Sequence, residues 1–88
     1  MQLGQIVCTA GVNDLMRKDL DFAIHCKNSL ARYDNKDWGD IGDDDKQVNT
    51  DALLHGNRLF AAYKGPEKIY IITEWDRSVT TILLPSEY

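Results

Sequence analysis

Residues 58–85, RLFAAYKGPEKIYIITEWDRSVTTILLP, hold most of the apolar side chains from which this chain can build a core. The pattern predicts three consecutive β-strands over 58–64, 69–74 and 79–84. Gly65-Pro66 marks the first turn, residues 75–78 form the second, and Pro85 stops the last strand. The C-terminal third therefore predicts a sheet of antiparallel strands.

Alternation along the middle strand predicts two different sheet faces. One face receives Ile69, Ile71 and Thr73, and the other receives Tyr70, Ile72 and Glu74. We expect helices to cover the first face and the second to be wet or used for contact. An exposed aromatic surface is expected from Tyr63, Tyr70, Trp75 and Tyr88.

The preceding residues predict one strand and two helices. The β-branched segment 5–10 predicts a strand that ends at Gly11, followed by a short turn around Leu15 and Met16. Apolar residues at steps of three and four predict an amphipathic helix from Asp19 to about Tyr33. A second helix is expected to begin at residues 43–45 and stop before Gly56, with a buried stripe of Val48, Ala52, Leu53 and, as a further candidate, Leu54.

The order β-α-α-β-β-β predicts an α+β fold, a small two-layer domain with two helices on a mostly antiparallel sheet of three to four strands. A chain of 88 residues supports a single domain, residues 1–88. We find no apolar run of about eighteen residues and no basic segment followed by an apolar one at the start. We therefore expect no membrane span, no signal peptide and a cytoplasmic location.

Acidic side chains outnumber basic ones, 14 to 10, giving a formal charge of −4. This balance disfavours direct nucleic-acid binding unless the cations gather on one face. The acids gather in one region, at Asp34, Asp37, Asp40, Asp43, Asp44, Asp45 and Asp51. Such a surface would attract a basic partner, including one whose groove normally receives nucleic acid. The alternative is that the run solvates a loop and caps a helix.

Two aromatic segments are candidates for contact. Trp38 lies in the loop 36–42, where it either plugs the edge of the core or anchors a partner. Trp75, Asp76 and Arg77 form a turn that either clamps a partner or serves the backbone, with Asp76 capping the turn and Arg77 bridging to Glu74 or Asp76.

Signatures of catalysis and of metal binding are missing from the sequence. Cys8, Cys26, His25 and His55 lack the paired spacing of zinc modules, and the two cysteines are expected to be small buried hydrophobes. Ser78, Thr80 and Thr81 have no His or Lys nearby in the sequence to act as a base. Glu74 and Asp76 form the best acid/base pair, but they need a pocket that a small core can hardly spare. We expect no enzyme activity and no cofactor.

Several motifs together resemble a known group of proteins. They are Gly11-Val-Asn-Asp-Leu, Asp37-Trp-Gly-Asp, Asn49 with Ala52-Leu53 and Gly56, Ala62-Tyr63, and the ending from Ile71, IITEWDRSVTTILLPSEY. The chain resembles, over nearly its full length, a family of small bacterial proteins encoded on plasmids, integrative elements and phages and often labelled plasmid-related. This family has no secure biochemical activity, so the resemblance supplies context and no catalytic residues.

The resemblance implies a role in inhibiting host defence, because small acidic proteins of mobile elements are frequently anti-CRISPR or anti-restriction proteins. Our leading hypothesis is a non-enzymatic inhibitor that binds a host defence protein with a basic surface and makes no direct contact with nucleic acid or membrane. Its expected partner-binding residues are Asp37, Trp38, Asp40, Asp43, Asp44, Asp45, Trp75, Asp76 and Arg77. The alternative is an accessory protein in plasmid maintenance or transcription control that self-associates through a sheet edge, as a homodimer for example.

Overall fold

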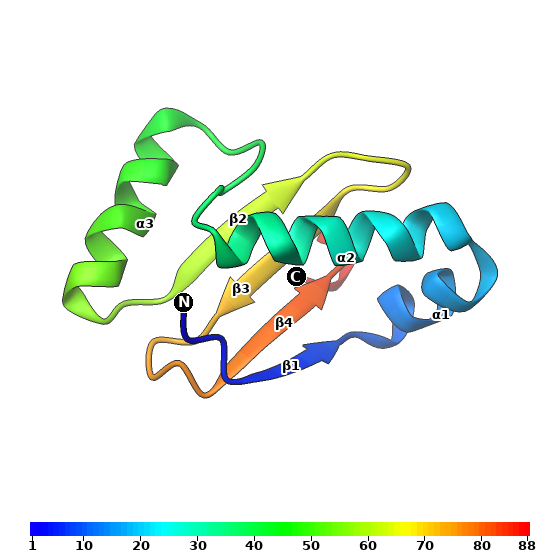
Figure 1. The fold of residues 1–88 in the computed structure, drawn as a ribbon, viewed down its shortest axis with the longest axis horizontal. Helices are drawn as coiled ribbons and strands as arrows, with labels where there is room; N and C mark the ends of the chain where they lie inside the picture. Colours follow the sequence, from blue (N-terminus) through cyan, green and yellow to red (C-terminus); the bar gives the residue numbers. More distant parts are fainter.

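The computed structural model describes residues 1–88 and shows helices packed on one face of a four-stranded sheet (Figure 1). The strands are β1 (Gln5–Cys8), β2 (Leu59–Tyr63), β3 (Ile69–Thr73) and β4 (Val79–Leu83). The helices are α1 (Ala10–Lys18), α2 (Leu20–Asp34) and α3 (Asp43–His55), followed at the end by a 3-10 turn, η1 (Pro85–Glu87). The predicted α+β two-layer fold is confirmed, with one helix more than the two expected.

The sheet has the strand order β1-β4-β3-β2. The β2–β3 and β3–β4 pairs are antiparallel hairpins, as the turn residues predict. β1 instead joins β4 in parallel, with Gln5 opposite Val79 and Cys8 opposite Ile82. The first strand of the chain therefore lies beside the last one, at an edge of the sheet. None of the helices has the length and the hydrophobicity that crossing a membrane requires.

Helix α1 replaces the turn that the sequence predicts around Leu15 and Met16. The first strand ends at Cys8, and Thr9 caps the helix by accepting a hydrogen bond from the amide of Val12 (3.5 Å). The carboxylate of Glu87, from the far end of the chain, accepts bonds from the Thr9 hydroxyl (2.5 Å) and the Gly11 amide (3.0 Å). Gly11 therefore lies in the first turn of a helix, where we predicted the end of a strand.

The core lies between the helices and one face of the sheet. Leu59, Ala61 and Tyr63 of β2, and Ile69 and Ile71 of β3, are fully buried there. The helices contribute Val12, Phe22, Cys26 and Tyr33 to the same cluster. Trp38 is only 6% exposed and its ring packs edge-on against that of Tyr33, with 5.5 Å between centroids. The prediction that Trp38 plugs the edge of the core is confirmed.

A chain of hydroxyl groups crosses this core. The Tyr33 hydroxyl lies 2.7 Å from Thr73 Oγ1, which lies 2.8 Å from Thr80 Oγ1. Thr80 donates to the carbonyl of Leu3 (2.7 Å). Because a carbonyl can only accept, the Thr80 proton is committed to Leu3, so Thr73 donates to Thr80 and Tyr33 donates to Thr73. Burial raises the pKa of Tyr33 to about 12, which keeps it protonated as the donor at the start of the chain.

The two edge strands of the sheet, β2 and β1, differ in whether other residues bond their outer backbone groups. Along β2, the Asn49 side chain donates to the carbonyl of Phe60 (2.7 Å) and accepts from the Phe60 amide (3.0 Å). Asp40 continues this closure, because its amide donates to Ala62 (2.7 Å) and its carboxylate accepts from the Lys64 amide (2.8 Å). β1 has no such cover, and its Ile6 is 45% exposed. The β2 edge is closed and the β1 edge is open.

Candidate partner-binding surface

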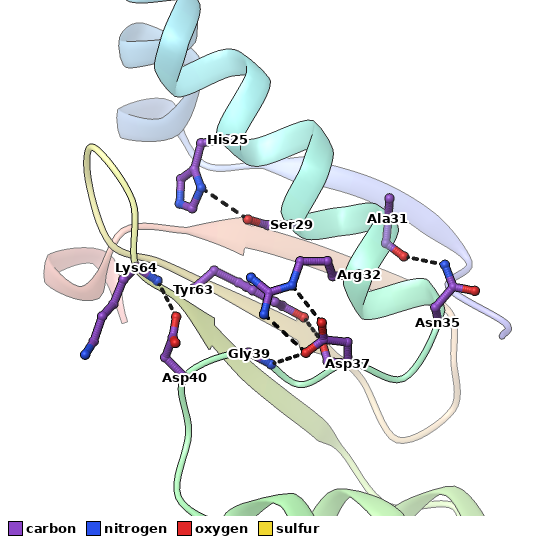
Figure 2. Close-up of polar contacts among 10 residues, drawn as sticks. All are labelled: His25, Ser29, Ala31, Arg32, Asn35, Asp37, Gly39, Asp40, Tyr63 and Lys64. Atoms are coloured by element: carbon purple, nitrogen blue, oxygen red, sulfur yellow. Dashed lines mark hydrogen bonds and ion pairs between the residues drawn. The ribbon is translucent and has the colours of Figure 1, made fainter.

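The loop between α2 and α3 uses two of the predicted site residues to fold itself. Figure 2 shows Asp37 held by the guanidinium of Arg32 (2.8 and 3.3 Å) and by the amide of Gly39 (3.1 Å). The bond from Arg32, followed by the one from Gly39, lowers the pKa of Asp37. Asp40 closes the β2 edge as described above. These two carboxylates, together with the buried Trp38, shape the loop, so the Trp38 ring is not accessible as an anchor.

Asp43, Asp44 and Asp45 are exposed in the first turn of α3. The N-cap is Gly42, and no side chain caps this end of the helix. The carboxylates face the positive end of the helix dipole, which stabilises them there, but they do not satisfy its backbone amides. The expectation that these acids accept bonds from the helix amides is therefore wrong. Their charges point to solvent and are free to meet another molecule.

Helix α3 is rotated from the orientation that its apolar residues predict. Asn49 and Ala52 are its buried residues, whereas Val48 is 59% exposed and Leu54 is 77% exposed. The cause is Asn49, whose side chain must face β2 to bond both backbone groups of Phe60. The helix positions next to Asn49 then turn away from the sheet. The predicted buried stripe through Val48 and Leu54 is wrong for these two residues.

The Trp75–Arg77 turn combines one exposed side chain with two that serve the backbone. Trp75 is 67% exposed. Asp76 accepts from the amide (3.0 Å) and the hydroxyl (2.6 Å) of Ser78, and these bonds lower the pKa of Asp76. Asp76 therefore stabilises the turn, as the backbone interpretation predicts.

Arg77 ties this turn to helix α3. It adopts a positive φ of 61°, and its guanidinium donates to the carbonyls of Ala52 (3.1 Å) and Asn57 (2.7 Å) at the end of the helix. It also donates to the carbonyl of Glu74 (3.1 Å) and forms no ion pair with a carboxylate. Because of these bonds, Trp75 lies near the C-terminal end of α3.

The structure thus connects two of the predicted segments through a surface that the sequence did not indicate. Asp43, Asp44 and Asp45 lie at one end of α3, and Trp75 lies near its other end, about 20 Å away by the rise of a helix of this length. Asp44, Val48 and Asp51 follow one another at helical spacing along the exposed side, and Leu54 comes three residues after Asp51. We call Asp43, Asp44, Val48, Asp51 and Leu54 the α3 face.

The predicted aromatic surface is only partly present. Tyr63 is fully buried, and its hydroxyl donates to the carbonyl of Asp37 (2.7 Å). Tyr70 and Tyr88 do lie together, with Phe60 as the third ring, on the face of the sheet away from the helices. Alternation in β2 was the signal for this arrangement, because Tyr63 shares the parity of Leu59 and Ala61.

The thiols and imidazoles do not assemble into a site. Burial raises the pKa of Cys26 to about 11, with a smaller contribution from Cys8, so this thiol is protonated at neutral pH. His25 lies beside Ser29 (3.4 Å; Figure 2), and His55 contacts the carbonyl of Asp51 (2.8 Å) within α3. No three side chains of the His, Cys, Asp and Glu types are arranged to hold a metal ion, and the surface has no pocket.

Comparisons with models of protein families, with curated proteins and with solved structures gave no match.

Proposed function

We propose that this chain is a non-enzymatic protein of a mobile genetic element that acts in the bacterial cytoplasm. It binds and inhibits a host defence complex of the anti-CRISPR or anti-restriction type. The observation that carries the proposal is the α3 face, where exposed aliphatic side chains lie among acids. The buried residues of this helix are Asn49 and Ala52. The biological setting rests on the resemblance of the sequence motifs to proteins of plasmids and phages, which stays a prediction.

The α3 face has the composition of a surface that meets a basic partner. Its acids offer charge complementarity to lysines and arginines that normally contact nucleic acid, which speeds encounter and selects the partner. Val48 and Leu54 add binding free energy from hydrophobic burial, because burying each of them contributes about 1.5 to 3 kcal/mol. Val48 and Leu54 are 59% and 77% exposed on this face, so both side chains are available to a partner.

The structure divides the predicted site residues into two groups under this proposal. Asp43, Asp44, Asp45 and Trp75 are exposed, as are Val48, Asp51 and Leu54, and these are the residues that we propose contact the partner. Asp37, Asp40, Asp76 and Arg77 hold the loop and the turn that carry this surface, and Trp38 fills the core beneath the loop. Substitutions in the second group reduce binding only through loss of structure.

Inhibition of purified CRISPR effector nucleases and restriction endonucleases tests the proposal. The protein is expected to block DNA cleavage by a host enzyme, and the double variant Asp44→Lys with Asp51→Lys is expected to abolish the block. Val48→Ser with Leu54→Ser should weaken it roughly tenfold or more, from the lost burial.

Asp21→Lys is the matched control, because Asp21 is an exposed acid in the first turn of α2. Its reversal carries the same helix-dipole cost as Asp44→Lys, about 0.3 to 1 kcal/mol, without touching the α3 face. Inhibition that survives the α3 variants, or that falls only in proportion to thermal stability, would contradict the proposal.

A second candidate function is a self-associating accessory protein in plasmid maintenance or transcription control. The open β1 edge favours it, because unpaired strand groups beside an exposed Ile6 can pair with β1 of a second copy. Light scattering distinguishes the two candidates. A stable dimer that Ile6→Lys converts to monomer supports the accessory protein, and a monomeric wild type supports the inhibitor.

A further inference from the structure

The side of the sheet opposite the helices forms a second surface, which we call the outer sheet face. It comprises Phe60, Ala62, Tyr70, Ile72, Thr81 and Leu83, with Tyr88 packed over them. No helix covers it (Figure 1). Ala62, Ile72 and Leu83 are at most 5% exposed although they lie outside the main core cluster, so the aromatic rings above them provide their cover.

Three aromatic rings gather on this face. Phe60 and Tyr70 have centroids 4.8 Å apart, and Tyr88 lies 6.0 Å from Phe60 and 5.8 Å from Tyr70. The rings come from two neighbouring strands and the C-terminal segment. Tyr88 remains 70% exposed, so the cluster presents ring surface to solvent.

Cations border the same rings. The Lys68 ammonium lies 5.6 Å from the centroid of Tyr70, and the Arg58 guanidinium lies 5.6 Å from that of Tyr88. Lys64 follows Tyr63, which pairs with Ile69, so Lys64 lies beside Lys68 at the end of the hairpin. The contact with Tyr70 places the Lys68 side chain on the outer sheet face.

Few acids lie around these rings. Alternation brings Glu74 to the outer side of β3, Glu67 lies in the turn next to Lys68, and the Glu87 carboxylate is turned toward Thr9 and Gly11. The acids that dominate the composition lie on the helices and on the loop before α3. In a chain with a charge of −4, the charged groups that contact these rings are therefore cations.

We propose that the outer sheet face binds single-stranded nucleic acid. Aromatic rings on an uncovered sheet stack unpaired bases, and flanking lysines and arginines contact the phosphates. A duplex buries the faces of its bases and offers nothing to these rings. An acidic peptide matches the cations but leaves the aromatic cluster without a counterpart. This property is independent of the α3 face, because the two surfaces have no residue in common.

Fluorescence anisotropy with labelled oligouridylate and oligothymidylate, about twelve nucleotides long, tests the proposal, and the two probes distinguish RNA from DNA. Binding is expected at low salt and weakens as salt rises. Tyr70→Ala is expected to reduce affinity roughly tenfold or more through lost stacking, whereas Tyr70→Phe retains it. Lys68→Gln should weaken binding of all sequences and reduce the salt slope by about one.

Lys27→Gln on α2 is the control for charge, because Lys27 is exposed on the helix side. If Tyr70→Ala does not fold, Lys64→Gln and Lys68→Gln carry the test, since both side chains are exposed. The proposal fails if neither oligonucleotide binds, if Lys27→Gln weakens binding as much as Lys68→Gln, or if the face variants change oligomeric mass instead of affinity. Asp44→Lys with Asp51→Lys must leave oligonucleotide binding in place, which separates this failure from that of the inhibitor.

Discussion

At the scale of single residues, the buried hydroxyl chain shows how polar side chains specify the packing of this core. Tyr33, Thr73 and Thr80 are each fully or almost fully buried, and each hydroxyl proton has one acceptor. The chain ends on the carbonyl of Leu3, so it connects α2, two strands and the segment before β1. Because the proton order is fixed from the Leu3 end, the residues are not equivalent.

Thr80→Val is expected to cost more stability than Tyr33→Phe. Valine leaves the Leu3 carbonyl without its donor and the Thr73 proton without its acceptor, and each unpaired buried group costs about 1 to 3 kcal/mol. Phenylalanine removes one donor and leaves the other bonds in place, at a cost of about 1 kcal/mol. Urea unfolding of both variants measures the difference. Equal losses, or a larger loss for Tyr33→Phe, would contradict the greater weight given to the Thr80 end of the chain.

At the scale of elements, α3 shows that a polar residue can orient a helix against its apolar pattern. Asn49 supplies β2 with the pair of hydrogen bonds that a further strand would supply. Its position fixes which side of the helix meets the sheet. The exposure of Val48 and Leu54 is a consequence of that choice.

Asn49→Ala is expected to lower the free energy of unfolding by about 2 kcal/mol or more, because the amide and the carbonyl of Phe60 both lose their partners. Thr50→Ala is the neighbouring control, since the Thr50 hydroxyl bonds only the Lys46 carbonyl in its own helix (3.2 Å). That control should change stability by less than about 0.5 kcal/mol. Chemical denaturation checks both. Similar stability of the two variants would show that Asn49 does not hold the edge.

The same elements show how far the sequence could predict the molecule. The C-terminal hairpins follow from local signals, namely alternation and the residues 65–66 and 75–78 at the turns. Helix α1 depends on Glu87, which reaches it from the other end of the chain, so Gly11 looked locally like the end of a strand. The orientation of α3 depends on the free edge of a strand that comes later in the chain. Pattern reasoning has no access to such partners.

The candidate site also has a part that the sequence predicts and a part that it does not. Charge belongs to the residue itself, so Asp43, Asp44 and Asp45 were identified as surface groups from their type, and Trp75 from the turn in which it lies. Arg77 was expected to meet a carboxylate and meets carbonyls of α3 instead. The aliphatic members of the α3 face were missed because apolar residues at helical spacing normally indicate a core. Only the neighbour of a helix decides which side is buried.

At the scale of the whole molecule, Glu87 connects the two ends of the chain. Its carboxylate bonds Thr9 and Gly11 at the start of α1 and the amide of Leu84 (3.0 Å). The bond from Thr9, followed by the one from Leu84, lowers the pKa of Glu87. The ionised carboxylate is therefore the form that stabilises the fold.

Glu87→Gln is expected to lower the melting temperature at neutral pH and to have less effect in acid. A carboxyl whose pKa is lower in the folded state contributes stability above its unfolded pKa of about 4.3, and this contribution is lost as pH falls through the folded pKa. Thermal melts from pH 7 downward should show the two proteins converging. A constant difference at every pH would mean that Glu87 acts through packing instead of charge.

The parallel pairing of β1 with β4 sets the order in which this protein can be completed during synthesis. Of the four strands of this sheet, β1 is made first and its only strand partner, β4, is made last. Helices α1 and α2 can form early from local contacts, but the sheet surface that they cover does not yet exist. A nascent chain that pauses before residue 79 therefore exposes an unpaired strand and an uncovered helix layer to chaperones and proteases.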